Sequence, residues 1–414
     1  MIPPLSTANA SSFAFADPAD AKLFWRHDKF HFPDPLAPME AAMLQRALGH
    51  GLAHGAAAYN VPIERVEMRS INGYHYRSIV MVAGSPDEMV ARSALAERSV
   101  CAAIARLDEL WTGKILPEVR EHLGFWESFD LAGATRRALT AHVAETWERL
   151  RRAWELRFEV GLPASIAISE FDELYRGLFP DAGPLDSYRL LEGLPNMTAE
   201  AGQELWRLSR RAIESNAVRA IIQTGDARKV PVVLNAASAG REPAIAAARE
   251  ALANHPAAVV GEFEAKLAAA QAGKVLTADC DFWIDTMTIH HLQAVLLEAG
   301  RRLVDDGALT SANDVFMLEP EELRDALIQP GVDLRFPAAV RAHAMECQAL
   351  MTAPAVLGTA PEAPPVNDPF ARFAAKCNGM LSMEQAGEDD IHGSSSSARA
   401  VSAARLDVEV PFAA

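Results

Sequence analysis

The strongest constraint on the fold is one β-hairpin signal in a chain whose other patterns are helical. In residues 65–82, RVEMRSINGYHYRSIVMV, apolar and polar side chains alternate on both sides of Asn72-Gly73. This dipeptide is typical of a two-residue type I′ turn. The turn fixes the pairing, so one face of the hairpin collects a cation and three apolar side chains: Arg69, Ile71, Tyr74 and Tyr76. That face is either a ligand platform or a sheet face packed under a helix.

Helical periodicity accounts for most of the remaining chain. One helix is predicted to start after Pro38 and to carry His50 and His54, although the glycines of GHGLAHG lower helix propensity there. The segment 85–111 opens with Ser at the N-cap and Pro at the first helical position, which are helix-start signals. Further helices are predicted at 113–123, 133–158, 169–178, 199–223, 241–253 and 258–272. The expected fold is mostly α, with a small antiparallel hairpin.

Local composition indicates three regions. Residues 1–20 are rich in Pro and small side chains and are expected to form a flexible arm. Residues 21–352 are expected to form one helical domain, entered through an extended, aromatic-rich segment at 24–38. Residues 353–414 begin with a Pro-rich linker and continue as a tail that is poor in bulky apolar residues.

Charge and cysteine usage narrow the class of protein. The 414 residues carry a formal net charge of −16, which disfavours nucleic acid or an anionic membrane as partner. The first lysine is Lys22, so we expect no signal peptide, and no apolar run is long enough to predict a membrane span. The four cysteines are widely spaced, as expected of free thiols in a reducing cytoplasm.

The stretch DCDFWIDTMTIHH (279–291) concentrates groups that carry chemistry. We expect a helix from Asp285, preceded by a loop in which Asp279 and Asp281 cap its N-terminus. An apolar stripe faces the core: Ile289, Leu292, Leu296, Ala299 and Leu303. His290 and His291 are adjacent and diverge, so a shared metal ion is not expected. The stretch is therefore either a polar helix entrance or an acid/base cluster.

The same stretch and its continuation resemble a block of the phosphoenolpyruvate synthase and rifampicin phosphotransferase superfamily. The resemblance rests on DCDFWID, the helix end GRRLV and the later DVFMLEPEEL. WRHDKFHFPDPLAP, INGYHYRSI and LLEGLPNMTAEAGQELWRLSR are similar to further segments of the family's middle domain, so the match covers roughly residues 20–350. Where the family has an acidic-His-Asn lead, this chain has DCD, which puts the role of that histidine in doubt.

The resemblance implies an acceptor-binding subunit of a split, ATP-dependent phosphotransferase similar to the phenylphosphate synthases. A glycine-rich ATP-grasp loop is not evident, and IHGSSSSARAV, with His392, is only faintly similar to the start of a swivelling domain. ATP and Mg²⁺ are therefore expected on an ATP-grasp partner subunit, and the phosphohistidine on a swivelling partner subunit. The expected acceptor is a phenol or another hydroxylated small molecule, and no cofactor is expected on this chain.

Site residues follow from what phosphoryl transfer to a hydroxyl requires, namely positioning, charge neutralisation and a base. Candidate bases are Asp285, His290 and His291. Candidate substrate-binding residues are Arg69, Tyr74, Tyr76, Asp281, Trp283, Arg301 and Arg302. Two other functions remain open: a non-catalytic ligand-binding or scaffold protein that lost the carrier domain, and a stand-alone lyase-type enzyme that uses the helical pocket without phosphate.

Overall fold

The fold is known from a computed structural model, which describes residues 13–29, 31–203 and 230–359. Its helices are α1 (Pro38–Met43), α2 (Gly49–Ala58), α3 (Pro86–Ile104), α4 (Leu107–Leu110), α5 (Leu116–Glu127), α6 (Arg136–Leu178), α7 (Asp186–Arg189), α9 (Val230–Ala251), α10 (Ala257–Cys280), α11 (Met287–Asp305), α12 (Pro320–Ile328) and α13 (Arg335–Ala349). Its strands are β1 (Phe24–His27), β2 (Ile63–Ile71), β3 (Tyr74–Met81) and β4 (Val356–Gly358). The mostly helical class with one small sheet is confirmed.

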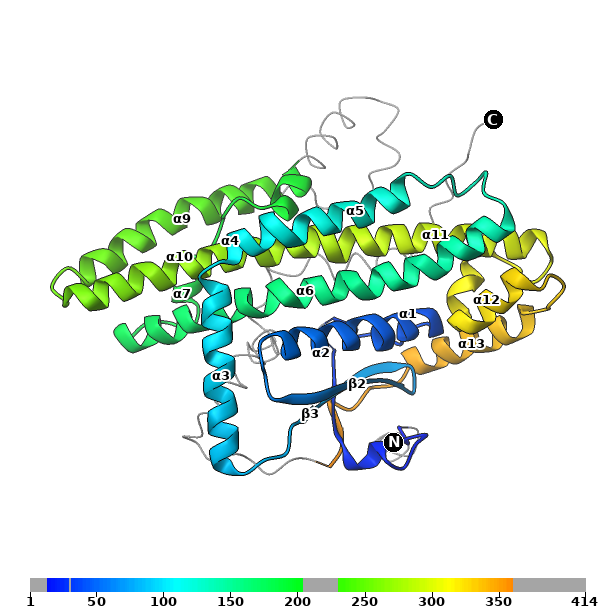
Figure 1. The fold of residues 1–414 in the computed structure, drawn as a ribbon, viewed down its shortest axis with the longest axis horizontal. Helices are drawn as coiled ribbons and strands as arrows, with labels where there is room; N and C mark the ends of the chain where they lie inside the picture. The colour runs from blue at the N-terminus through cyan, green and yellow to red at the C-terminus, as the bar shows by residue number, and fades with distance from the viewer. Residues whose placement is uncertain (1–12, 30, 204–229, 360–414) are drawn as a thin grey trace, which may run out of the picture.

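Helix α6 is the axis of the molecule (Figure 1). It spans 43 residues, joining two segments that were predicted as separate helices, and it continues through Pro163. Helices α10 and α11 follow one another along its length, and α2 lies against its middle. The large apolar core forms between α1, α5, α6, α10, α11 and α12. The predicted stripe on α11 is confirmed at its buried positions, from Leu292 to Leu303.

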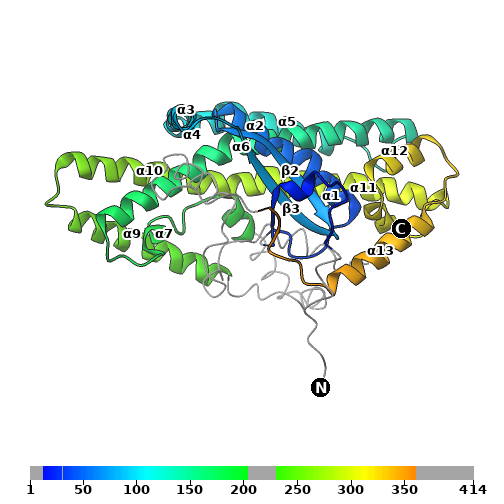
Figure 2. The same cartoon turned by 90° about the horizontal axis from the view of Figure 1, so that it is seen from below.

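The sheet covers one side of this bundle (Figure 2). Its strands are arranged in the order β2-β3-β1-β4, with antiparallel pairing throughout. The hairpin register is confirmed, since Ile71 pairs with Tyr74 and the turn residues Asn72 and Gly73 have φ of 51° and 83°. Strand β1 lies in the extended segment predicted at 24–38, and β4 comes from a distant part of the chain.

In the part of the chain that the structure describes, three π-helical turns lie at the junctions α1–α2, α4–α5 and α10–α11. They span Leu44–Leu48, Trp111–Ile115 and Asp281–Thr286, and each of them contacts α6. Such turns insert an extra residue into a helix and are frequent at functional sites. At each of these three contacts with α6, the extra residue changes the direction in which the side chains of the turn point.

The glycines of α2 allow a close approach to α6. A Cβ atom added at Gly51 would lie 2.5 Å from the Trp154 carbonyl oxygen, and one at Gly55 would lie 2.6 Å from Phe158 Cβ. The glycines thus cost helix propensity but let two backbones pack together. The contact brings the His50 and His54 imidazoles onto two carboxylates of α6.

These two carboxylates, Glu155 and Glu159, are nearly buried and form a ladder of ion pairs. Glu155 Oε1 lies 2.7 Å from His50 Nε2, and Glu159 Oε1 lies 3.1 Å from His54 Nε2. Arg152 Nη1 bonds both carboxylates. Burial alone would raise the pKa of each carboxyl, but the hydrogen bonds, from Arg152 to Glu155 and from Lys114 to Glu159, outweigh it and lower both pKa values.

The ladder predicts acid sensitivity. Because both folded-state pKa values lie below the ordinary glutamate value, their stabilisation is complete above that value, about 4.3, and is lost as the pH falls through the lowered values. The double change Glu155→Gln/Glu159→Gln should lower the unfolding free energy by about 2–3 kcal/mol at pH 7, and by less near pH 3.5. Urea unfolding at both pH values measures this, and the exposed Glu109→Gln is the control. An equal loss at both pH values would contradict it.

Within the described residues, no helix is both long and apolar enough to cross a membrane. The predicted helix at 199–223 lies mostly outside the described residues, as do most of the N-terminal arm and residues 360–414, including His392. Of the region expected as a Pro-rich linker, residues 353–359 are described, and they contribute β4 to the sheet.

Candidate functional site

The stretch 279–291 is the middle of one continuous helical rod. Helix α10 ends at Cys280, the π-helical turn spans Asp281–Thr286, and α11 follows without a break. The expected loop before Asp285, with Asp279 and Asp281 as caps, is therefore wrong. No Gly or Pro interrupts the stretch, and Cys280 and Ile284 anchor it in the core. Asp279 instead accepts a hydrogen bond at 2.7 Å from the backbone N–H of Met197, in the loop that follows α7.

The two remaining aspartates share one arginine of α6. Arg157 Nη2 lies 2.8 Å from Asp281 Oδ1, and Arg157 Nε lies 3.1 Å from Asp285 Oδ1. The aspartates are four positions apart, so both side chains reach the same side of the rod. The Arg157 side chain is 11% exposed and that of Asp285 is 19% exposed. Arg157 Nη1 is buried and has no hydrogen-bond partner among the described residues.

Burial changes the acidity of Asp285. Burial and the neighbouring carboxylate of Asp281 raise the pKa of this carboxyl, whereas the charge of Arg157 lowers it. The net result is a pKa raised from 3.8 to about 6. The charge of His31 acts in the opposite direction, so His31 is an electrostatic neighbour of Asp285. A carboxyl with a pKa near 6 is ionised at neutral pH and is basic enough to accept a proton from a bound hydroxyl.

His31 belongs to a second charged cluster, at the end of the sheet. Asp28, directly after β1, accepts hydrogen bonds from His31 Nδ1 at 2.8 Å and from Arg77 Nη1 at 2.9 Å. Burial would raise the pKa of Asp28, but the hydrogen bond and charge of His31 and the charge of Arg77 lower it well below its usual range. A buried carboxylate bonded to Nδ1 orients an imidazole, as it does in catalytic dyads.

His75 on β3 completes this cluster. Burial lowers its pKa to about 4, so its imidazole is neutral at pH 7. Its ring packs edge-on against Phe32 at 5.2 Å between centroids. We call the two clusters together the polar centre. It contains seven residues: Asp28, His31, His75, Arg77, Arg157, Asp281 and Asp285. The centre combines a carboxyl of raised pKa, an imidazole held by Asp28, and a buried guanidinium, one nitrogen of which has no hydrogen-bond partner among the described residues.

Sequence reasoning found two members of the polar centre, Asp281 and Asp285, and missed the rest. The spacing of Asp28 and His31, three residues apart after a predicted extended segment, was a usable local signal. Arg157 gave no such signal, since it is one of several arginines on a long helix.

The aromatic face of the hairpin is covered. Tyr74 and Tyr76 are buried in a small core with Phe13, Trp25 and Ile71. The Tyr74 hydroxyl donates to the Met351 carbonyl at 2.7 Å, and the Tyr76 hydroxyl donates to the Pro354 carbonyl at 2.7 Å. The Tyr74 hydroxyl also lies 3.0 Å from the Gln348 carbonyl, so the last turn of α13 and the segment after it cover this face. The third candidate on it, Arg69, pairs with Asp20 and Glu67.

The other predicted site residues lie in separate places. Among the described residues, the ring and ion contacts of His290 and His291 are with each other, Trp126 and Glu127. The Trp283 ring lies under the Arg120 guanidinium. Arg301 pairs with Glu298 and Asp305, and Arg302 bonds Glu298 and the carbonyls of Leu131, Ala132 and Ala134. The structure does not join these five residues to Asp285.

No metal cluster is evident in the part of the chain that the structure describes, where no three His, Cys, Asp or Glu side chains are placed to share an ion. The three described cysteines, Cys101, Cys280 and Cys347, form no disulfide bond with one another. Burial raises the pKa of the Cys280 thiol well above its usual range, so it is not an activated nucleophile.

Comparisons with known proteins give one informative similarity. No family model matches the chain. The chain is similar to part of chondramide synthase cmdD from Chondromyces crocatus, with 29% identity over an alignment 462 residues long. The alignment covers 94% of this chain but 12% of that protein. This chain therefore spans a small part of the length of its much larger relative.

Proposed function

We propose that this chain binds a hydroxylated small molecule at the polar centre and presents it for phosphoryl transfer from a phosphohistidine on a partner chain. In the transfer, the acceptor hydroxyl gives its proton to the Asp285 carboxylate. The acceptor oxygen then forms a bond to phosphorus, while the P–N bond of the phosphohistidine breaks and its electron pair returns to the imidazole nitrogen. A phenol is the favoured acceptor, as the resemblance in the sequence implies.

The observation that carries this proposal is the pairing of Asp285 with Arg157 on facing helices. Phosphoryl transfer needs a base for the incoming hydroxyl and a cation for the charge on the phosphoryl oxygens. A guanidinium suits phosphate because it can donate two parallel hydrogen bonds. Arg157 uses Nε and Nη2 to hold the two aspartates, and its buried Nη1 has no hydrogen-bond partner among the described residues. Nη1 is therefore the donor that we propose for the phosphoryl oxygen.

The Asp28–His31 pair supplies the second acid/base group. Asp28 fixes the imidazole through Nδ1, and the side chain of His31 is 41% exposed, so it can reach a bound molecule. In the proposed transfer, the imidazole of His31 hydrogen-bonds the acceptor and positions it toward Asp285. Arg77 is 7% exposed and holds Asp28 in place.

The matched part of chondramide synthase cmdD spans 12% of that protein, so the unit is there one part of a much longer polypeptide. By analogy, we propose that this chain acts together with other units. The resemblance in the sequence, and not this similarity, implies that those units carry the nucleotide site and the phosphohistidine.

A lyase-type enzyme is the second candidate function, because the same two groups, Asp285 and His31, could move protons without any phosphate. The two functions differ in what they require. Phosphoryl transfer depends on ATP and on partner chains, whereas a lyase would convert its substrate with this chain alone. A scaffold protein would do neither.

The test uses an extract of the source organism from which the gene for this chain has been deleted. The extract receives labelled ATP, a panel of phenols and alcohols, and the purified chain. We expect a labelled small-molecule product only when extract, ATP and chain are all present. The rate should rise with pH through about 6, because the Asp285 carboxylate must be ionised to accept a proton. Product formed by the chain alone without ATP would establish the lyase, and no chain-dependent product with any acceptor would reject both enzymes.

A further inference from the structure

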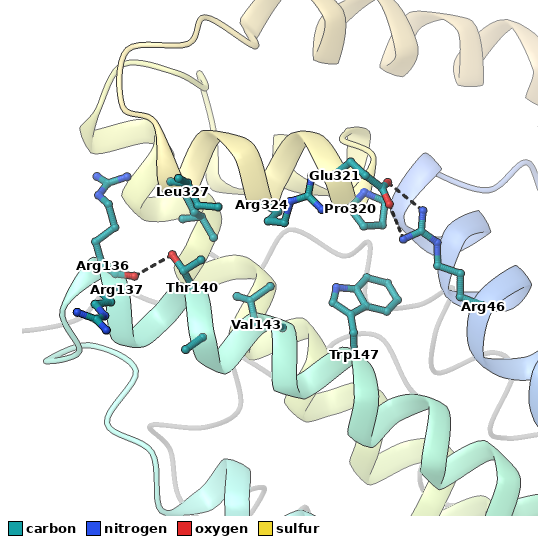
Figure 3. A pocket seen from close by; sticks show the side chains of 13 residues that line it. Arg46, Arg136, Arg137, Thr140, Val143, Trp147, Pro320, Glu321, Arg324 and Leu327 are labelled. Carbon is teal, nitrogen blue, oxygen red and sulfur yellow. Dashed lines mark hydrogen bonds and ion pairs between the residues drawn. The ribbon is translucent and has the colours of Figure 1, made fainter.

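A cavity of about 730 Å³ opens at the end of the molecule opposite α9, between the first turns of α6, helix α12 and the π-helical turn Leu44–Leu48. Figure 3 shows its lining side chains. Its size is within the range of sites for small organic molecules. None of its lining residues belongs to the polar centre, so it does not depend on the proposed function.

The floor of the cavity is apolar. Val143 and Trp147 project from α6 toward α12, with Trp147 next to Pro320. Leu327 and Ile328 of α12 extend the same surface. Ala141 and Ala144 add small side chains on α6. A bound molecule would therefore place rings or an aliphatic chain against this floor, since burying such surface is favourable.

The rim of the cavity is strongly cationic for a protein of net charge −16. Four arginines line it: Arg46, Arg136, Arg137 and Arg324. The one acid among the lining residues, Glu321, is held by Arg46 in a two-point ion pair, with N···O distances of 2.8 and 2.9 Å. The remaining three arginines, Arg136, Arg137 and Arg324, have no counter-charge among the residues that line the cavity.

The three arginines Arg136, Arg137 and Arg324 differ in their ion-pair partners. Arg136 pairs with Asp306, but its Nη1 is buried without a hydrogen-bond partner among the described residues. Arg324 pairs with its chain neighbour Asp325, and both side chains are exposed. Such an exposed ion pair is weak, so a bound anion can replace it. Arg137 has no ion pair within the described part of the chain. Arg136 and Arg137 also occupy the first turn of α6, where the helix dipole favours an anion.

We propose that this cavity is a binding site for an amphipathic organic anion, a molecule with an apolar body and one carboxylate or sulfonate group. The body lies on the apolar floor formed by Val143, Trp147 and Leu327, and the anionic group lies at the arginine-lined rim. The geometry excludes a neutral lipid chain as the preferred ligand, because such a chain would leave the guanidiniums unpartnered at the rim. It also disfavours a protein partner, because the site is concave and of small-molecule size.

The test is a matched pair of fluorescent probes on the full chain. Anilinonaphthalene sulfonate has the apolar body and the anion, and phenylnaphthylamine has the same rings without the charge. We expect the sulfonate to bind at least about tenfold more tightly than the neutral probe. Dodecanoate should displace it, and dodecanol should do so poorly. In Arg137→Gln/Arg324→Gln, affinity for the sulfonate should fall about tenfold or more, while affinity for the neutral probe stays within about twofold.

Two further variants make the result decisive. Ala141→Trp fills the cavity from an exposed position of α6 and should abolish binding of both probes with an unchanged circular dichroism spectrum. Arg106→Gln removes an exposed arginine far from the cavity and should leave both affinities unchanged. Wild-type binding in the folded Ala141→Trp variant would place the probes elsewhere and overturn the proposal. Equal loss of both probes in the double arginine variant would overturn it as well.

Discussion

Replacing Asp285 with asparagine is expected to slow the reconstituted phosphoryl transfer by about 10²–10⁴-fold, the usual cost of losing a general base. Asparagine keeps the size of the side chain, and its carbonyl oxygen can still accept a hydrogen bond from Arg157 Nε. Arg157 also keeps its 2.8 Å contact with Asp281. Binding of the acceptor should therefore change much less than turnover.

The stability of the same variant should be equal to or higher than that of the wild type at pH 7. The folded-state pKa of Asp285, about 6, is raised above its ordinary value of 3.8. Such a carboxyl is most compatible with folding at low pH, and its ionisation costs stability as the pH rises toward neutral. Melting curves measured beside turnover on the same preparations test both statements. Asp333→Asn, at an exposed ion pair, is the control.

A slow and stable Asp285→Asn variant would support the general base. A variant that turns over at the wild-type rate but melts at a lower temperature would make Asp285 a structural residue. The assignment of the base would then move to His31, and His31→Gln would be the next variant to measure. The Asp285→Asn result is informative whichever acceptor is used, because the expected loss is in the rate and not in recognition.

What the sequence predicted correctly was encoded locally. The hairpin register follows from alternation around Asn72-Gly73, and the start of α3 follows from Ser85, whose hydroxyl accepts the backbone N–H of Glu88. Both features involve residues within a few positions of one another. Neighbouring residues are enough to define a turn or a cap.

What the sequence did not reveal depends on contacts between distant elements. The continuity of α10 and α11 is maintained by the core beneath Cys280 and Ile284 and by the contact with α6. A loop was predicted there because the polar residues before Asp285 were interpreted as solvent-exposed. The covering of Tyr74 and Tyr76 comes from residues more than 270 positions away, which no local pattern could indicate.

The polar centre shows the same limit most clearly. Its members come from the end of β1, from β3, from α6 and from the π-helical turn, so Asp28 and Asp285 are far apart in the chain. Sequence patterns could identify individual acids as candidates. They could not show that Arg157, 124 residues before Asp281, forms ion pairs with both Asp281 and Asp285.

The largest expected change in stability follows from this arginine. Arg157→Met should lower the unfolding free energy at pH 7.5 by about 3–5 kcal/mol, because removing one partner of a buried ion pair leaves the other charges uncompensated. Here two carboxylates, Asp281 and Asp285, would face each other without a cation. Methionine fills a similar volume, so the loss measures charge more than packing. Urea unfolding provides the value, and Arg176→Met on the same helix, which breaks an exposed pair with Asp172, should cost only about 0.3–0.5 kcal/mol.

The pH dependence separates this electrostatic account from a simple packing defect. Without Arg157 the folded-state pKa of Asp285 should rise still further above its ordinary value, since the cation that opposed the effect of burial is gone. The destabilisation should therefore be large at pH 7.5 and clearly smaller at pH 5, where Asp285 takes up a proton. Adding Asp281→Asn and Asp285→Asn to Arg157→Met should restore most of the lost stability at pH 7.5, because neutral amides then replace the two carboxylates that had lost their cation. A loss that is the same at both pH values, and that the triple variant does not recover, would mean that Arg157 contributes through packing alone.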